Sequence, residues 1–268
     1  MTMPIDFVLV RHGESEGNAA NSRSRKGDDK DFDEAFLTRH SSKWRLTDRG
    51  KEHARLAGLW IRDNIGTDFF RYYVSEYLRA METAALLSLP GAKWYVDFYL
   101  RERDWGALDL MTNHDRYLHF AKDLERRKID SFYWNPPRGE SMAQLCRRLD
   151  RILGTLHREC ADKKVIIVCH GEVMWAFRIR LERMLQKRFQ DLDNSKHPFD
   201  HIHNCQVLHF TRRHPATGEI SPFIDWFRSV CPSDLSLSKN EWEKIERRKF
   251  TNEDLMTEVE QYPRYVAE

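Results

Sequence analysis

The sequence predicts an α/β protein built around a largely parallel β-sheet. Short apolar runs, typical of buried strands, alternate along the 268-residue chain with stretches whose apolar residues recur every three or four positions. Two of the expected strands end in a histidine followed by glycine, at His12 and at His170. Ligand sites of open α/β sheets form beyond the carboxyl ends of the strands, so these two histidines also indicate where a site is expected.

The first half of the chain supplies two expected helices and three expected strands. Thr47 is placed to cap a helix, and a second helix over residues 78–89 is expected to end before Pro90. The first helix carries its apolar side chains on one face, at Ala54, Ala57 and Ile61. Strands are expected over residues 7–10, 72–75 and 94–96.

The second half contains the clearest helix, which starts at Ser141. Ser141 and Gln144 have the spacing of a capping box. The apolar stripe of this helix consists of Met142, Leu145, Leu149, Ile152 and Leu156. A continuous apolar strand over 165–168 and a helix through 175–179 follow. Residues 206–210 and 222–226 are expected to pair as a hairpin around 215–218.

The chain is expected to divide into a domain over residues 1–231 and a charged C-terminal extension over 232–268. In the extension, Ser238 with Glu241 and Thr251 with Asp254 have capping-box spacing, which predicts one or two short helices. The polar stretch 21–43 is expected to be a long loop, and loops of this length are usually functional or disordered.

Composition restricts the class of protein. Lysine and arginine number 44 against 42 acidic residues, and a net charge of +2 gives no reason to expect nucleic acid as a partner. No apolar run approaches the roughly 18 residues that span a bilayer, and no signal peptide is visible. Five irregularly spaced cysteines are typical of reduced thiols. We therefore expect a cytoplasmic protein without a membrane partner.

The two histidines and two arginines predict a pocket for an anion. Arg11 precedes His12, and Arg79 falls in the first turn of the helix that follows the strand at 72–75. Guanidinium groups form paired hydrogen bonds to phosphate oxygens. They also disfavour protonation of an imidazole, which keeps His12 available as a nucleophile near neutral pH. Attack on phosphorus would give a phosphohistidine, and the second histidine would help to stabilise the transition state.

A metal site is not expected. The segment from His197 to Cys205 contains three histidines and a cysteine, but their spacing matches no standard zinc pattern. No other cofactor is indicated.

Four blocks of the sequence, in order, resemble the histidine phosphatase superfamily, in its phosphoglycerate mutase-like branch. They are Arg11-His12-Gly13-Glu14-Ser15 with Asn18, the stretch 75–80 with Thr83-Ala84, the stretch 100–106, and Cys169-His170-Gly171-Glu172. Further landmarks lie at 46–50, 139–141 and 204–207, so that the resemblance covers residues 5–227. It implies a three-layer α/β/α fold with a mostly parallel central sheet.

The resemblance also implies a role for each matching residue. His12 corresponds to the nucleophile, and Arg11, Asn18, Arg79 and His170 correspond to the residues that bind the phosphate. Glu102 corresponds to the acid that protonates the leaving oxygen and then activates water as a base. The family chemistry uses no metal or other cofactor.

Within this resemblance a phosphatase is favoured over a mutase. Gly17 stands where the mutases have a tryptophan, and the stretch 21–43 replaces their loop. Two alternatives remain: a phosphoglycerate mutase-type phosphotransferase, and a non-catalytic protein that binds phosphate and regulates a partner. The substrate stays open between phosphorylated small molecules (a sugar phosphate, nucleotide or inositol phosphate) and a phosphoprotein. The stretches 21–43 and 111–135, and the extension, are expected to determine the choice. The oligomeric state is not indicated.

Overall fold

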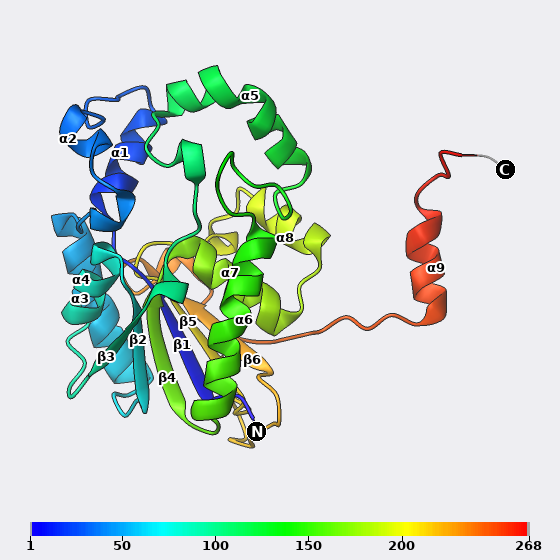
Figure 1. Cartoon of the computed structure of the whole chain (residues 1–268). Helices are drawn as coiled ribbons and strands as arrows, with labels where there is room; N and C mark the ends of the chain where they lie inside the picture. Colours follow the sequence, from blue (N-terminus) through cyan, green and yellow to red (C-terminus); the bar gives the residue numbers. More distant parts are fainter. Residues whose placement is uncertain (1, 267–268) are drawn as a thin grey trace.

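The computed structural model describes residues 2–266 and shows a seven-stranded sheet in the order β3-β2-β4-β1-β5-β6-β7 (Figure 1). The strands β3, β2, β4 and β1 run parallel to one another, whereas β5, β6 and β7 are added through antiparallel pairs. The predicted α/β fold with a parallel core is therefore confirmed. The strands are β1 (Asp6–Arg11), β2 (Arg71–Ser75), β3 (Trp94–Asp97), β4 (Lys164–Cys169), β5 (Val207–Thr211), β6 (Trp226–Val230) and β7 (Trp242–Lys244).

Helices cover both faces of the sheet, which gives the three layers that the resemblance implied (Figure 1). α6 and α7 pack on one face, and α3 and α4 pack on the other. The α-helices are α1 (Glu16–Ser24), α2 (Glu34–Leu37), α3 (Asp48–Asn64), α4 (Leu78–Leu86), α5 (Asn113–Ile129), α6 (Met142–Glu159), α7 (Gly171–Glu182), α8 (Gln186–Asp193) and α9 (Asn252–Glu260). Short 3₁₀-helices are η1 (Ser41–Lys43), η2 (Phe98–Leu100), η3 (Gly106–Leu108), η4 (Pro198–Asp200) and η5 (Leu235–Leu237).

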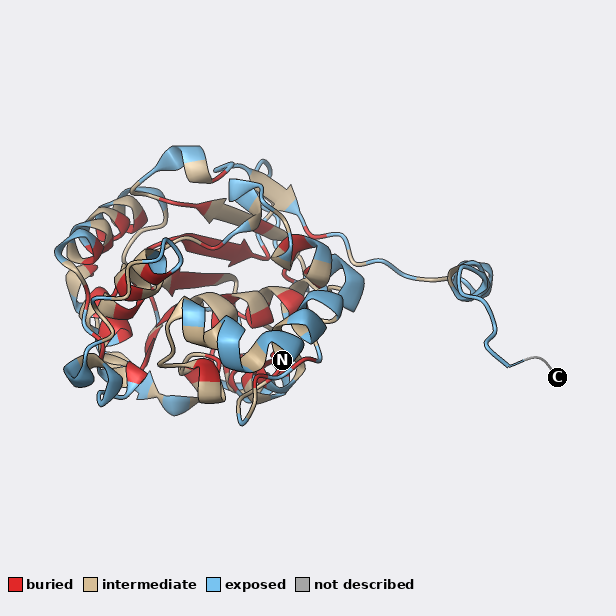
Figure 2. Cartoon of the chain, turned by 90° about the horizontal axis from the view of Figure 1, so that it is seen from above, coloured by how far each residue is buried: buried red, intermediate tan, exposed pale blue. Residues whose placement is uncertain are grey.

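The central strand β1 explains why both faces need a helical layer. Phe7 and Leu9 enter the core under α6 and α7, while Val8 and Val10 enter the core on the opposite face. All four side chains are fully buried. A continuous apolar run of this kind is typical of a parallel strand enclosed on both sides, and each such side chain contributes roughly 1.5–3 kcal/mol through burial. Figure 2 shows the buried sheet between helices whose outer surfaces are exposed.

The helix predicted from Ser141 is confirmed as α6. The Ser141 hydroxyl accepts a hydrogen bond from the backbone N–H of Gln144, whose side chain in turn accepts from the backbone N–H of Ser141. The predicted apolar stripe is buried along its whole length. The helix capped by Thr47 is likewise present as α3.

Two expected boundaries differ in the structure. α4 ends at Leu86 because the chain turns at Ser88, which has a φ of 49°. The second strand of the hairpin was expected over 222–226 but starts at Trp226, four residues after the predicted start. The delay arises because the Ser221 hydroxyl bonds the Asp225 carboxylate and closes a second turn after the one at 214–219.

The stretch 21–43 is only partly a loop. Its first residues continue α1 as far as Ser24, and α2 and η1 lie within it. The rest is held by internal ion pairs, including the one between Arg23 and Asp31. This segment is therefore an ordered insertion that runs from α1 back to the sheet.

The extension beyond residue 231 contains one predicted capping box and lacks the other. Thr251 and Asp254 cap α9 as expected. Ser238 starts no helix, because its hydroxyl accepts from the backbone N–H of Cys231, and the strand β7 follows at Trp242. β7 extends the sheet, whereas α9 lies away from it (Figure 1). The division at residue 231 stays a prediction, and residues 1, 267 and 268 lie outside the described part.

Across residues 2–266, no helix combines the length and apolar character that crossing a membrane requires.

Candidate active site

The register of the sheet brings His12 and His170 together. Arg11 at the end of β1 lies opposite Cys169 at the end of β4, so the next residue of each strand projects from the same edge. The two imidazole rings lie 5.1 Å apart between centroids, at an angle of 63°. Both side chains are buried, with exposed fractions of 2% for His12 and 0% for His170. The sequence prediction that the two histidines face one another is confirmed.

The hydrogen bonds of His12 define its tautomer. Nδ1 lies 2.7 Å from the carbonyl oxygen of Gly13, which only accepts, so Nδ1 carries the proton. Nε2 accepts a hydrogen bond of 3.1 Å from Nε of Arg79, which only donates. His12 is therefore neutral, and the lone pair of Nε2 faces the site.

The surroundings of His12 favour this neutral form. Burial, together with the positive charges of Arg79 and Arg11, lowers the pKa of His12 well below its ordinary value. The pKa of His170 is lowered well below its ordinary value by burial and by Arg79. A neutral imidazole at position 12 is the form required for attack on phosphorus.

His170 is oriented by the strand β2. Its Nε2 lies 2.8 Å from the hydroxyl of Ser75, the last residue of that strand. Its Nδ1 is buried and has no hydrogen-bond partner among residues 2–266. The ring of Tyr77 packs against it edge-on, with centroids 5.1 Å apart. An unsatisfied buried nitrogen next to two guanidinium groups is consistent with a site that binds a polar ligand.

Arg79 and Arg11 flank the histidines, as the sequence predicted. Besides its bond to His12, Arg79 donates from Nη1 to the carbonyl oxygen of Ser41 at 2.7 Å, so η1 of the insertion holds this guanidinium in place. Arg11 donates from Nη1 to the carbonyl oxygen of Ile202. Its Nε is buried and unpaired in the described part of the chain, next to the backbone of Gly171.

Asn18 has a structural role that the resemblance did not include. Its side-chain oxygen accepts from the backbone N–H and the hydroxyl of Ser15, which completes the capping box of α1. The same oxygen accepts from Nδ2 of Asn204, which also donates to the carbonyl oxygen of His12. Asn204 thus links Asn18 to the backbone of the histidine. A phosphate-binding role for Asn18 stays a prediction, and its Nδ2 is the atom left to provide it.

Glu102 lies close to the two histidines and has a strongly shifted pKa. Burial and the neighbouring carboxylate of Glu172 raise the pKa of Glu102 to about 7, while Arg79 opposes the shift. The pKa of a general acid at neutral pH is best placed in this range. The backbone N–H of Arg103 donates to Oε1 at 2.9 Å and fixes one carboxylate oxygen.

The loop that carries Glu102 is held by a residue of α6. Arg148 donates to the carbonyl oxygens of Tyr99, Arg101 and Glu102, and forms a two-point ion pair with Glu140 at 3.0 and 2.8 Å. The side chains of Arg148 and Glu140 are only 7% and 13% exposed. This buried clamp fixes the position of Glu102 relative to the sheet.

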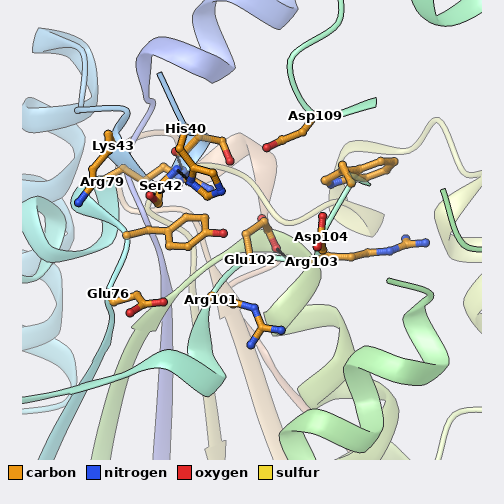
Figure 3. A pocket seen from close by; sticks show the side chains of 13 residues that line it. His40, Ser42, Lys43, Glu76, Arg79, Arg101, Glu102, Arg103, Asp104 and Asp109 are labelled. Atoms are coloured by element: carbon orange, nitrogen blue, oxygen red, sulfur yellow. Dashed lines mark hydrogen bonds between the residues drawn. The ribbon is translucent and has the colours of Figure 1, made fainter. Parts of the chain in front are cut away.

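A pocket of about 350 Å³ opens from this centre to the surface (Figure 3). Arg79 and Glu102 lie at its inner end. Its outer wall is formed by η1 of the insertion, by Glu76 and Tyr77 after β2, and by the segment from Arg101 to Asp109. The prediction that part of 21–43 contributes to the site is thus supported by Ser41, Ser42 and Lys43. Residues 111–135 do not line this pocket.

His12, Glu102 and His170 are also the residues that could hold a metal ion. One ligand atom of each lies within 4.8 Å of the others. The donor set resembles that of a divalent metal site, but two guanidinium groups beside it favour an anion over a cation. In the described part of the chain this is the one such group, so the histidines at 197–203 do not converge with Cys205.

Several residues of the site were not assigned by sequence reasoning. Three of them act through hydrogen bonds between residues 38 to 192 positions apart in the chain: Ser41, Arg148 and Asn204. The fourth, Tyr77, lines the pocket wall. No sequence pattern indicated the roles of these four residues. The sequence did place Ser75 at the end of a strand, but it gave no role for Ser75.

Comparison with known proteins agrees with this geometry. The model of the histidine phosphatase superfamily (branch 1) matches residues 7–216. Among curated proteins, the rat 6-phosphofructo-2-kinase/fructose-2,6-bisphosphatase 1 is 30% identical over 195 residues, which are 73% of this chain and 36% of the relative. The human protein of that name is 29% identical over the same length and shares. The chain thus spans about a third of the length of these relatives.

Two solved structures share the fold. A putative α-ribazole-5′-P phosphatase from Escherichia coli superimposes with a TM-score of 0.61 at 19% identity, over 79% of this chain and 92% of that one. A mycobacterial glucosyl-3-phosphoglycerate phosphatase in complex with VO₃ gives a TM-score of 0.60 at 18% identity, over 84% and 96% of the two chains.

Proposed function

The chain belongs to the histidine phosphatase superfamily, and we propose that it is a metal-independent phosphatase that hydrolyses phosphomonoesters through a phosphohistidine on His12. The observation that carries this proposal is the tautomer of His12. Its Nδ1–H is held by the Gly13 carbonyl, and its Nε2 accepts from Arg79, which lines the pocket together with Glu102.

The first chemical step forms a bond from Nε2 of His12 to phosphorus. Arg79 first releases Nε2 and turns its guanidinium toward the phosphate oxygens, where Arg11, Asn18 and His170 also donate. The bond between phosphorus and the ester oxygen then breaks. Protonated Glu102 gives its proton to that oxygen, so the alcohol leaves in neutral form.

The second step returns the enzyme to its starting state. Glu102 is now a carboxylate and takes a proton from a water molecule, whose oxygen bonds to phosphorus as the bond to His12 breaks. Inorganic phosphate leaves. A pKa of about 7 for Glu102 makes both its protonated and its ionised form accessible at neutral pH, which the two opposite roles require.

The packing of Trp44, the residue that follows the insertion, supports hydrolysis over a mutase-type transfer. A β-carbon added to Gly17 would lie 2.1 Å from Cε3 of Trp44, so the ring of Trp44 fills the space beside this glycine. A tryptophan at position 17, as the mutases have, does not fit against Trp44 in this position.

The substrate proposed at this stage is a phosphorylated small molecule, and the compartment is the cytoplasm. The curated relatives are named for a sugar bisphosphate, and the solved structures are named for other small phosphate esters. The five cysteines are buried thiols, in keeping with a reducing compartment.

The test compares the parent with His12→Ala on an aryl phosphate in the presence of EDTA. Release of phosphate by the parent that survives the chelator and disappears in the variant supports the proposal. ³²P label that stays on the parent after quenching in detergent at alkaline pH, that acid treatment removes, and that is absent from the variant would identify the phosphohistidine. A folded parent without turnover on any phosphate ester would instead favour the non-catalytic, phosphate-binding alternative.

A further inference from the structure

The outer wall of the pocket in Figure 3 differs in charge from its inner end. The inner end holds the guanidinium of Arg79 beside His12. Arg103, although it lines the wall, is committed to an ion pair with Glu172 and to the carbonyl oxygens of Glu140 and Trp134. The outer wall therefore offers a ligand three carboxylates, those of Glu76, Asp104 and Asp109. It also offers two cations, those of Lys43 and Arg101.

The carboxylates of the outer wall have free acceptor atoms. The side chains of Glu76 and Asp109 form neither a hydrogen bond nor an ion pair with any of residues 2–266. Asp104 uses Oδ1 to accept from the backbone N–H of Gly106 at 2.8 Å and keeps Oδ2 free. Burial lowers the pKa of Arg79 and raises the pKa of Tyr77, and the charge of Asp109 also acts on both groups, so Asp109 lies near the centre. In Figure 3, Asp109 lies on one side of Glu102, and Glu76 and Arg101 lie on the other.

The remaining lining groups suit an uncharged ligand with hydroxyl groups. The aromatic side chains of Tyr77 and Trp105 offer apolar surface, while Ser42 and His40 add polar atoms. His40 uses Nδ1 to accept from the backbone N–H of Ser42, so its Nε2 is available to a ligand. A hydroxyl group can donate to a carboxylate and accept from an ammonium or guanidinium group, and it therefore fits either kind of charged neighbour.

We infer that this outer wall accepts the uncharged, hydroxyl-bearing leaving group of a sugar or polyol monophosphate and disfavours a substrate with a second phosphate or a carboxylate. The inference rests on the proposed phosphatase function, because it describes the leaving group of that reaction. Hydroxyl groups of the ligand donate to Asp109 and Glu76, and Lys43 and Arg101 donate to its oxygens. A second phosphate would place its negative charge among three carboxylates, and only two cations would oppose them.

This assignment differs from what the names of the curated relatives suggest. Those relatives are named for a bisphosphate, whereas the outer wall of this chain carries more unpaired carboxylates than unpaired cations. The insertion contributes His40, Ser42 and Lys43 to this wall.

The experiment measures kcat/KM for two matched pairs of esters: glucose 6-phosphate with glucose 1,6-bisphosphate, and fructose 6-phosphate with fructose 1,6-bisphosphate. Turnover of an aryl phosphate serves as the reference for phosphatase activity that does not depend on the leaving-group contacts. We expect each monophosphate to exceed its bisphosphate by about tenfold or more, which corresponds to ~1.4 kcal/mol. Added salt should reduce this ratio, because Glu76 and Asp104 are exposed and their charges are screened.

The double variant Glu76→Gln/Asp109→Asn tests the cause of the preference. It should bring the ratio of monophosphate to bisphosphate close to one, since the amides keep the shape and remove the charge. The matched control is Asp63→Asn, an exposed acid on the last turn of α3 that does not line the pocket, and it should leave the ratio unchanged.

The outcomes separate this inference from the proposed function. Aryl phosphate turnover combined with a preference for the bisphosphates, or with no turnover of either monophosphate, would overturn the inference and leave the phosphatase function in place. A monophosphate preference that the double variant retains would also overturn it. Absence of all turnover, including that of the aryl ester, would overturn the proposed function itself.

Discussion

The Nε–H of Arg79 donates to Nε2 of His12 at 3.1 Å, so this arginine covers the nitrogen proposed to attack phosphorus. The same side chain is anchored by the Ser41 carbonyl at 2.7 Å. Arg79 therefore keeps the nucleophile neutral in the free enzyme and must exchange this bond for phosphate oxygens when the substrate binds.

Replacing Arg79 should change both the rate and the titration of His12. Arg79→Ala removes a donor to the transition state and should lower kcat/KM by about 100-fold or more. It also removes a positive charge that holds the pKa of His12 down, so that pKa should rise. Histidine NMR shifts followed against pH provide the measurement. Arg79→Lys is the control, because it keeps the charge and loses the planar geometry. An unchanged pKa in Arg79→Ala would contradict this account.

The ionisation of Glu102 should limit the rate of alkyl phosphate hydrolysis at alkaline pH. Its proton is needed by a poor leaving group, and its pKa is raised to about 7, so activity should fall as the pH rises through that value. Aryl esters need less protonation of the leaving oxygen. The ratio of alkyl to aryl kcat/KM, measured from pH 5 to 9 (about two units either side), should therefore decline across this range. In Glu102→Gln the ratio should be low and independent of pH.

The same carboxyl should weaken the fold at alkaline pH. Because its pKa is about 7 in the folded protein and near 4.5 when unfolded, the folded state retains a proton that the unfolded state has lost between these values. The contribution of Glu102 to stability thus falls as the pH rises from 4.5 through 7. Glu102→Gln should raise the Tm at pH 8 (about one unit above that range) relative to the parent, with little effect near pH 4. A lower Tm for the variant at alkaline pH would refute this.

The clamp formed by Arg148 should matter for stability and for the acid step. Arg148→Met leaves Glu140 buried without its partner and should lower the free energy of unfolding by about 3 kcal/mol. Loosening of the loop should reduce kcat on alkyl phosphates more than on aryl phosphates. Arg180→Met is the matched control, because its pair with Asp150 is about half exposed and should contribute less than ~1 kcal/mol. Denaturant titration of both variants gives the comparison.

Two glycines should respond in opposite ways to alanine. In Gly17→Ala the new β-carbon would lie 2.1 Å from the ring of Trp44, and displacement of that ring should cost about 1–3 kcal/mol. Gly154 lies inside α6, where the nearest atom to a β-carbon is the mobile end of Arg158 at 3.4 Å. Gly154→Ala should therefore stabilise the protein by up to ~1 kcal/mol. Equal Tm values for the two variants would show that Trp44 does not fill this space.

The parallel strands and the clearest helices of the fold follow directly from local sequence. Phe7 to Val10 form a short continuous apolar run, which is typical of a strand enclosed on both faces. Ser141 and Gln144 cap α6 through bonds that depend only on neighbouring residues. Element boundaries that depend on contacts between distant residues could not be predicted from local sequence. Ser238 has the local spacing of a capping box, but its hydroxyl instead bonds the backbone of Cys231.

The site was predictable to the extent that strand ends determine it. His12 and His170 could be placed together because parallel strands present their carboxyl ends at one edge, and Arg79 because it opens the helix after β2. The catalytic and phosphate-binding roles of His12, Glu102, His170, Arg11, Asn18 and Arg79 remain predictions, which the experiments above address.

The sequence by itself determined the α/β class, the positions of the parallel strands and of β5, and the identity of the histidines, since these depend on local periodicity and on residue type. The tertiary structure alone decided how the groups interact. It set the tautomer of His12 through Gly13 and Arg79, and it raised the pKa of Glu102 by burial and by the approach of Glu172. It also enclosed the pocket with η1 of the insertion. Hydrogen bonds, desolvation and charge act through space, and the distances that govern them arise only when segments far apart in the chain have packed together.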